Sequence, residues 1–229
     1  MGLLSAFLKY QLRPRAGGAG APAAGGFDAS LFADSGLSPA EIGKILDWVA
    51  QGLPAPPPHT VKQAVVRTYA GRYGARVMVE TGTYFGAMVE AMKNDFDHIY
   101  SIELSRQLYE NAAARFCGDA RITLIQGDSG TAIGGVLKAL ARPALFWLDG
   151  HWSAGVTARG DGNTPVRKEL AAIFAAADLP HVILIDDARE FGRDPEYPGI
   201  DELRQYVHAQ RPHFEFSVDT DIIRIHPRG

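Results

Sequence analysis

The strongest constraint on the fold is an alternation of two kinds of segment along residues 76–226. Short apolar runs rich in β-branched residues alternate with stretches of helical periodicity. The apolar runs are 76–80, 98–103, 121–126, 144–149 and 181–186, and the helical stretches are about 86–94, 105–116, 130–141 and 164–176. Strands with nearly continuous apolar sequence are buried on both faces, as in a parallel sheet. The chain is therefore expected to be an α/β protein with a Rossmann-like, doubly wound and mostly parallel sheet.

The two ends of this region predict further elements. After a helix near residues 200–210, two strands at 213–218 and 221–226 are separated only by Asp219 and Thr220, which predicts an antiparallel hairpin at the sheet edge. Before the alternation, the sequence Ser38-Pro39-Ala40-Glu41 is a capping box with proline at the first helical position. A second helix is expected over about residues 60–72, so N-terminal helices precede the sheet.

The first 26 residues have a different character from the rest. Residues 13–26 are almost entirely glycine, alanine and proline, which is typical of a flexible linker. We expect residues 1–26 to form a short helix and a linker, and residues 27–229 to form a single domain with a helical cap (27–74) and a Rossmann-like core (75–229). The apolar pattern from Leu3 to Leu12 predicts a helix that packs on the body or on a partner chain, as in a homodimer; a peripheral membrane foot is the alternative.

Composition excludes several classes of function. The formal net charge is -3, so no general basic field attracts nucleic acid, and no nucleic-acid partner is expected. The single cysteine, Cys117, excludes an internal disulfide framework and a cysteine-rich zinc site, and it fits a reducing cytoplasm. No apolar run approaches the roughly 20 residues of a transmembrane helix. We therefore expect no transmembrane segment and a cytoplasmic location.

Acidic residues stand at the end of each of the five apolar strands. In an open α/β sheet, ligands bind outside the carboxyl ends of the strands, near the point where the strand order reverses. The residues at these positions are Glu80, Glu103, Asp128, Asp149, and Asp186 with Asp187. An acid at the end of one strand is common, whereas acids at five successive strand ends indicate a ligand site.

The loop after the first strand contains Gly82, Thr83, Tyr84, Phe85 and Gly86. A dinucleotide-binding loop has three glycines because its backbone approaches a pyrophosphate closely. This loop has two, with two bulky aromatic residues between them, which favours a smaller and less charged ligand. The alternative is that the loop is only a tight turn between a strand and a helix.

The next two strand ends predict contacts to a nucleoside. An ionised acid such as Glu103 accepts hydrogen bonds from two ribose hydroxyls. Asp128 and Ser129 follow the third strand, where a carboxylate or hydroxyl can meet an adenine amino group. The alternative for each acid is that it caps the next helix.

The motif series resembles that of class I S-adenosylmethionine-dependent methyltransferases. The motifs are VETGTYFGAMVEAMK, YSIELS, IQGDSG and FWLDGHW, and the resemblance covers residues 76–226. The sequence is closer to the branch that includes catechol O-methyltransferase and macrocin-type sugar O-methyltransferases, and to bacterial proteins with DGHW and IDDAR motifs. The resemblance implies S-adenosylmethionine as cofactor, bound by Glu80, Gly82, Thr83, Tyr84, Gly86, Glu103, Asp128, Ser129 and Asp149.

The same resemblance implies a metal site. The metal-binding acids of that branch match Asp149, Asp186 and Asp187 here. Adjacent carboxylates repel unless a cation lies nearby, and three hard oxygen ligands suit a divalent ion, Mg²⁺ first, with Mn²⁺ and Ca²⁺ as alternatives. The competing interpretation is that Asp186 and Asp187 cap the following turn and bind Arg189.

The predicted function is transfer of a methyl group to a hydroxyl. His151 and Asp149 are the predicted catalytic residues, His151 as general base or as a fourth metal ligand, although a loop histidine without either role is the alternative. The expected acceptor is a small molecule or glycan, with a sugar or other polyol favoured. Two rivals remain: a catalytically silent binding module with the same fold, and a nicotinamide-dependent oxidoreductase, which the two-glycine loop disfavours.

Overall fold

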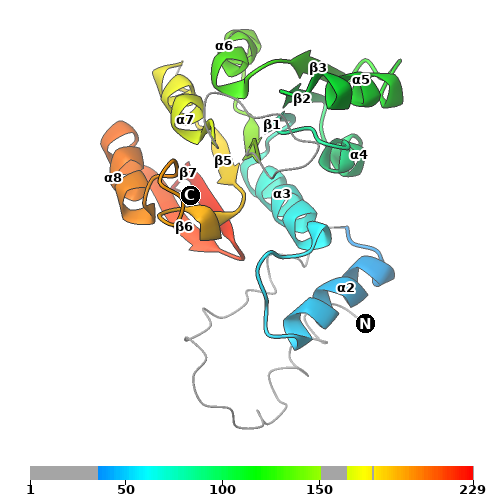
Figure 1. The fold of residues 1–229 in the computed structure, drawn as a ribbon, viewed down its shortest axis with the longest axis horizontal. Helices are drawn as coiled ribbons and strands as arrows, with labels where there is room; N and C mark the ends of the chain where they lie inside the picture. Colours follow the sequence, from blue (N-terminus) through cyan, green and yellow to red (C-terminus); the bar gives the residue numbers. More distant parts are fainter. Residues whose placement is uncertain (1–35, 151–163, 177, 229) are drawn as a thin grey trace.

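The computed structural model describes residues 36–150, 164–176 and 178–228. In these residues a sheet of seven strands has the order β3-β2-β1-β4-β5-β7-β6 (Figure 1). The strands are β1 (Val77–Thr81), β2 (His98–Glu103), β3 (Ile122–Gln126), β4 (Leu145–Leu148), β5 (Val182–Ile185), β6 (Phe214–Asp219) and β7 (Ile222–Pro227). Strands β1 to β5 pair in parallel, and β7 lies antiparallel between β5 and β6. The doubly wound sheet with an antiparallel C-terminal hairpin is confirmed.

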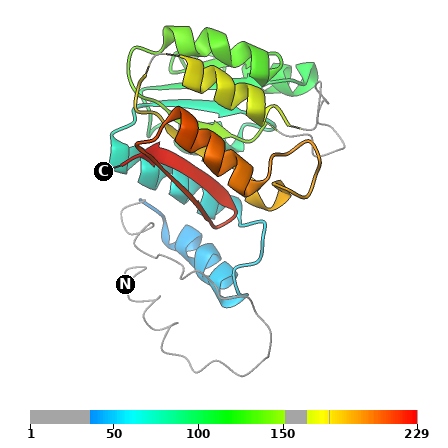
Figure 2. The same ribbon diagram turned by 90° about the vertical axis from the view of Figure 1, so that its left-hand side faces the viewer.

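Helices cover both faces of this sheet (Figures 1 and 2). One face carries α3 (His59–Tyr73), α4 (Ala87–Met92) and α5 (Arg106–Arg115), and the other carries α6 (Ser129–Ala139), α7 (Val166–Ala175) and α8 (Ile200–Gln210). Alternate residues of one strand enter opposite cores: Met78 packs with α3 and α4, whereas Val77 and Val79 pack with α6 and α7. Strands β1, β4 and β5 are buried along their whole length, which explains their unbroken apolar sequence.

The predicted N-terminal helices are confirmed among the described residues. Helix α2 (Pro39–Ala50) begins with the capping box of Ser38 and Glu41, and α3 ends at Gly74, whose φ of 61° is the left-handed conformation common after a helix. Val61 and Val65 of α3 belong to the same core as Leu184 of β5, so α3 is built into the α/β unit. The predicted helix from Leu3 to Leu12 and the linker lie outside the described residues.

The hairpin turn differs by one residue from the sequence prediction. Asp219 still pairs with Ile222, and the two turn residues are Thr220 and Asp221, not Asp219 and Thr220. Both have positive φ, 52° and 61°, which matches a turn with both central residues left-handed. Neither residue is glycine or asparagine, so sequence alone did not locate the turn. A residue outside the hairpin stabilises the turn, because the backbone N–H of Arg189 donates to the Asp221 carboxylate at 2.8 Å.

No helix in the described part of the chain has the length and apolarity needed to cross a membrane.

Candidate active site at the carboxyl ends of the strands

The strand order reverses between β1 and β4, and the loops that follow these strands lie together. The Asp149 N–H donates to the Thr81 carbonyl at 3.1 Å, and the Gly82 N–H donates to the Ile102 carbonyl at 2.9 Å. The Asp186 N–H donates to the Leu148 carbonyl at 3.0 Å. The hydrogen bonds between neighbouring strands thus continue one residue past the strand ends. They place the predicted site residues side by side along one edge of the sheet.

The two glycines of the first loop are required by packing. Gly82 has a φ of +83°, and a Cβ placed there would lie 2.4 Å from the backbone oxygen of Asp149. A Cβ at Gly86 would lie 2.7 Å from the Phe116 ring. The sequence resemblance implied that these glycines bind the cofactor, and this stays a prediction. The structure gives a different reason for their small size, because Gly82 lets the β1 and β4 loops touch and Gly86 fits against α5.

Glu103 connects the first loop to the second strand. Its two carboxylate oxygens accept hydrogen bonds from the Tyr84 N–H and the Ser105 N–H, both at 2.8 Å. Tyr84 has a φ of 50°, an unfavourable conformation for a residue with a side chain, and its bond to Glu103 helps to hold it. Glu103 is therefore a buried acceptor at the predicted ribose position, and it also shapes the loop.

Glu80 lies at the end of β1 and is buried. It accepts a hydrogen bond from the Ser101 hydroxyl, and that hydroxyl lies 2.6 Å from the Thr83 hydroxyl. Burial raises the pKa of Glu80 to about 8, and the nearby acids Asp149 and Glu103 push the pKa in the same direction. This carboxyl group is thus neutral at pH 7 unless a positive charge approaches it.

Asp128 caps α6, because its carboxylate accepts from the Thr131 N–H at 3.2 Å. The capping alternative is confirmed, while a contact to adenine stays a prediction. Ser129 is the first residue of α6, is buried and neighbours Glu169 of α7. Burial raises the pKa of Glu169 to about 7, although the Ser129 and Thr81 hydroxyls lower it.

Two aromatic side chains are exposed on the same loop. Tyr84 and Phe85 are 45% and 54% exposed, and their ring centroids are 4.1 Å apart. The Arg115 guanidinium donates to the Phe85 carbonyl at 2.7 Å. The loop thus presents an apolar surface beside the row of acids.

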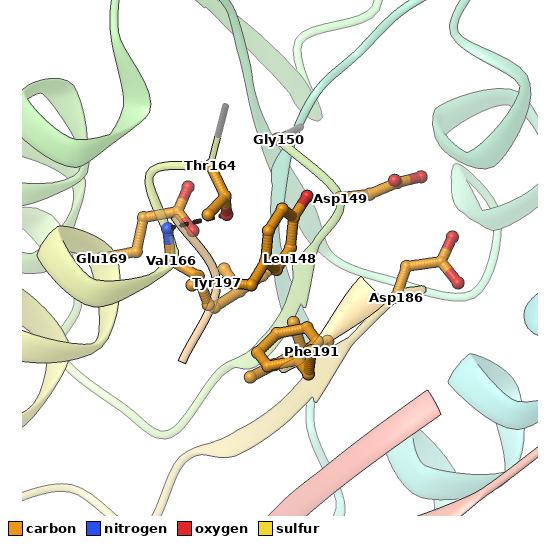
Figure 3. A pocket seen from close by; sticks show the side chains of 10 residues that line it. Leu148, Asp149, Gly150, Thr164, Val166, Glu169, Asp186, Phe191 and Tyr197 are labelled. Carbon is orange, nitrogen blue, oxygen red and sulfur yellow. Dashed lines mark hydrogen bonds between the residues drawn. The ribbon is translucent and has the colours of Figure 1, made fainter. Parts of the chain in front are cut away.

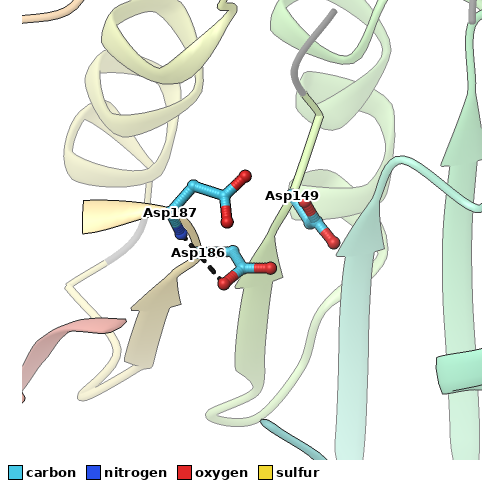
Figure 4. Close-up of side chains that lie close together, drawn as sticks. All are labelled: Asp149, Asp186 and Asp187. Atoms are coloured by element: carbon cyan, nitrogen blue, oxygen red, sulfur yellow. Dashed lines mark hydrogen bonds between the residues drawn. The ribbon is translucent and has the colours of Figure 1, made fainter. Parts of the chain in front are cut away.

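Three acids gather at the ends of β4 and β5, as the sequence predicted (Figure 4). Asp149 follows β4 and Asp186 and Asp187 follow β5, and the two strands are paired neighbours. One carboxylate oxygen from each lies within 4.8 Å of the others. The Asp187 N–H donates to Asp186 Oδ1 at 2.9 Å, and the φ of Asp187 is 56°.

The competing prediction about these acids is also partly right. The Arg189 guanidinium donates to Asp187 Oδ1 at 2.7 Å and also forms an ion pair with Asp221 of the hairpin turn. Arg189 therefore links the acid cluster to the C-terminal hairpin. Asp187 precedes a short 3₁₀ turn, Ala188–Glu190, which places Arg189 in reach.

Sequence reasoning missed Lys62, a buried lysine on α3. Its Nζ forms a hydrogen-bonded ion pair with Asp186 Oδ2 and lies 3.7 Å from Asp187 Oδ1. Burial lowers the pKa of Lys62, but the attraction of Asp186 outweighs this effect, and the net pKa is raised. Burial and Asp149 raise the pKa of Asp186 to about 7, although Lys62 opposes this shift.

Two sequence signals could have found the missed residues. Helix α3 is buried on most sides, and Lys62 has no acid three or four residues away on its own helix, so its charge must be met from elsewhere. Glu169 of α7 falls on the apolar face marked by Val166 and Ile173. A charged residue on a buried face indicates a paired or functional group.

The fit of a divalent ion can be tested against this geometry. Three carboxylates are the donors that such an ion prefers. However, the Lys62 ammonium group is already bonded to Asp186 Oδ2 and lies 3.7 Å from Asp187 Oδ1, so a divalent ion among these oxygens would meet a like charge at close range. With Lys62 so placed, the residues do not fit a divalent ion.

A small pocket opens beside the acids (Figure 3). It encloses about 10 Å³, room for about one water molecule. Asp149, Asp186 and Glu169 supply its acidic lining, and Phe191 and Tyr197 supply an aromatic wall. Burial raises the pKa of the Tyr197 phenol, which therefore stays protonated at neutral pH. The predicted catalytic residue His151 lies outside the described residues.

The sequence comparisons with known proteins cover little of the chain. No protein-family model matches the chain. Over 73 residues the chain is 37% identical to ribosomal RNA small subunit methyltransferase A of Acidobacterium capsulatum, a match that covers 32% of this chain and only a quarter (25%) of that relative's length.

Solved structures match much more of the chain. The O-methyltransferase TomG from Streptomyces achromogenes, in complex with SAM, has a TM-score of 0.52 and 16% identity, covering 84% of this chain and 91% of its own. The Bacillus cereus O-methyltransferase in complex with SAH has a TM-score of 0.56 and 13% identity, covering 84% and 92%. The fold implied by the sequence resemblance, that of S-adenosylmethionine-dependent O-methyltransferases, is confirmed.

Proposed function

We propose that this protein is an S-adenosylmethionine-dependent O-methyltransferase that acts on a hydroxyl of a small molecule, a sugar or other polyol. One observation carries the proposal: the predicted cofactor loop and the predicted acceptor acids meet at the reversal of strand order, where Gly82 packs against Asp149. The O-methyltransferase fold of the chain supports it.

On the cofactor side, the site offers acceptors and carboxylates. Each oxygen of Glu103 already accepts one backbone N–H and has a second lone pair for a ribose hydroxyl. The cofactor carries a positive sulfonium and a positive amino group, which favour acidic surroundings such as Glu80 and Asp149. Thr83, Tyr84, Asp128 and Ser129 complete the proposed cofactor contacts.

The chemistry needs an aligned acceptor and a place for one proton. The acceptor oxygen forms a bond to the methyl carbon as the bond from that carbon to sulfur breaks, and sulfur keeps the electron pair as a neutral thioether. The hydroxyl proton passes to a base, for which Asp149 and His151 are the proposed groups. Because the sulfonium is already a good leaving group, alignment and deprotonation are most of what the protein supplies.

The acidic lining favours a small polar acceptor over nucleic acid. Phosphate groups would meet like charge beside Asp149, Asp186 and Glu169, whereas a neutral hydroxyl would not. The local likeness to a ribosomal RNA methyltransferase makes RNA the second candidate acceptor. Lys62 supplies positive charge at the place that the sequence assigned to a divalent ion.

The first experiment measures binding of S-adenosylhomocysteine and of NAD by calorimetry with the full chain. We expect binding of the first and not of the second; NAD binding alone would support the oxidoreductase, and binding of neither would contradict the proposal. Transfer of a radiolabelled methyl group to mixtures of sugars, polyols and structured RNA then separates the acceptors. Cofactor binding without transfer to any of them is the result expected of a silent binding module. His151→Ala should lower the rate and leave cofactor affinity unchanged.

A further inference from the structure

The acid cluster contains its own cation. Lys62 reaches it from α3, 124 residues away in sequence from Asp186, and its side chain is 10% exposed. Its Nζ contacts Asp186 and Asp187, and the charge of Asp149 also favours the protonated amine. Three elements, α3, β4 and β5, thus bring one positive and three negative groups together.

A second cation, Arg189, pairs with the cluster at Asp187. Arg189 is shared between Asp187 and Asp221, so it connects the cluster to the hairpin turn. Asp186 has a different set of partners: the Lys62 ammonium on Oδ2 and the Asp187 N–H on Oδ1. Lys62 is therefore the side-chain cation that compensates Asp186 among the described residues.

A buried charge needs a partner within reach, because taking it out of water is costly. A divalent ion and the Lys62 ammonium would compete for the same carboxylates. The ammonium has the advantage of being covalently attached, so its effective concentration at the carboxylate does not depend on the solution.

We infer that Lys62 is the resident counter-cation of the acceptor site, that it takes the place of a divalent metal ion, and that it positions Asp186 and Asp187 for the acceptor. Lys62 acts through the two carboxylates and is a positioning residue. Its part in methyl transfer rests on the proposed function, whereas exclusion of a metal ion by Lys62 does not.

The test measures binding of Mn²⁺ to the full chain by the loss of the free-ion signal in electron paramagnetic resonance. We expect the natural protein to bind no stoichiometric Mn²⁺ at about 1 mM. This concentration is roughly the upper limit at which binding to adventitious surface sites can be ignored. Lys62→Met removes the ammonium and should create a site that binds Mn²⁺ at least about tenfold more tightly. Adding Asp186→Asn to Lys62→Met should remove that new site.

Lys93→Met is the matched control, because it makes the same chemical change at a lysine that pairs with Glu90 on the surface. It should bind Mn²⁺ no better than the natural protein. If Lys62→Met is unstable without a metal ion, added Mn²⁺ should stabilise it and raise its melting temperature. The melting temperature of Lys93→Met should not change when Mn²⁺ is added.

Two results would overturn the inference. One is stoichiometric Mn²⁺ binding by the natural protein that Asp186→Asn removes, a measurement that does not depend on how Lys62→Met folds. The other is a folded Lys62→Met protein that gains no Mn²⁺ affinity. Once an acceptor is found, methyl transfer by the natural protein should survive exhaustive chelation, and that by Lys62→Met should depend on added Mn²⁺. Absence of methyl transfer in every sample would contradict the proposed function and leave the Mn²⁺ result intact.

Discussion

The acids at the ends of β1 to β3 and those at the ends of β4 and β5 are stabilised in different ways. Glu80, Glu103 and Asp128 accept hydrogen bonds from a hydroxyl and from backbone N–H groups. Asp186 and Asp187 are paired with the cations Lys62 and Arg189. Among the described residues, no ion pair reaches Glu80 or Glu103.

This difference matches the charge that each half of the site is proposed to receive. A cofactor with a sulfonium is itself a cation, so acids without a resident cation suit its half of the site. A neutral hydroxyl that must lose a proton brings no charge, so the acids in its half need a cation of their own. Substitutions at Lys62, Gly82, Glu103 and Glu80 test this contrast.

The largest effect should follow the loss of the buried cation. Lys62→Met leaves Asp186 buried without its ionic partner, so we expect the free energy of unfolding to fall by about 3–5 kcal/mol. Chemical denaturation in the presence of a chelator measures the change. Lys93→Met breaks an exposed pair and should cost less than about 1 kcal/mol. Equal losses in the two variants would mean that the acceptor half does not depend on its cation.

The second effect concerns the contact between the two halves. Gly82→Ala places a Cβ against the Asp149 backbone in a left-handed conformation, so we expect a loss of about 2–4 kcal/mol in stability and weaker cofactor binding. Gly118→Ala is the matched control, since Gly118 has a φ of +87° but open space around its Cβ position. It should show only the conformational cost, about 1–2 kcal/mol. If the two variants lose the same free energy of unfolding, the packing of Gly82 on Asp149 does not contribute to stability.

The third effect is a loss of cofactor affinity that should follow a substitution in the cofactor half and not one elsewhere on the surface. Glu103→Ala removes the proposed ribose acceptor and the support of Tyr84, so the affinity for S-adenosylhomocysteine should fall at least about tenfold, or about 1.4 kcal/mol. Glu110→Ala removes an exposed acid from α5 and should leave the affinity unchanged. Calorimetry measures both, and an unchanged affinity in Glu103→Ala would contradict its proposed role.

Much of the fold could be predicted because the signals are local. Continuous apolar runs located the five parallel strands to within about one residue, and the Ser38–Glu41 capping box located the start of α2. The hairpin turn was misplaced by one residue because its conformation depends on a distant partner, Arg189. A turn without glycine or asparagine gives no local signal of its left-handed residues.

The candidate site was predictable only in part, for the same physical reason. Acids at strand ends are visible in the sequence because parallel strands bring their carboxyl ends to one edge of the sheet. Lys62 was not visible in this way, since its partner lies on another element and only the packing of α3 against β4 and β5 brings the two together. The packing of Gly82 was likewise not visible, because its neighbour is the backbone of Asp149 on another strand end.

The smallest effect is a change in the pH dependence of stability. Burial raises the pKa of Glu80 to about 8, from about 4.5 in the unfolded chain. The folded state therefore holds a proton that the unfolded state releases, so the stabilising contribution is complete below pH 4.5 and is lost as the pH rises towards 8. Glu80→Gln keeps the shape of the side chain and cannot ionise. Between pH 5.5 and 8 the free energy of unfolding of the natural protein should therefore fall by at least about 1 kcal/mol more than that of Glu80→Gln.

Denaturation of both proteins across this pH range isolates Glu80, because Glu169 and Asp186, which also have raised pKa values, are common to the two. Glu110→Gln, an exposed substitution of the same type, should follow the natural protein at every pH. Parallel curves for Glu80→Gln and the natural protein would mean that Glu80 is ionised in the folded state. The cofactor half would then contain a buried negative charge held by hydrogen bonds alone, and the expectation that burial keeps Glu80 protonated would be wrong.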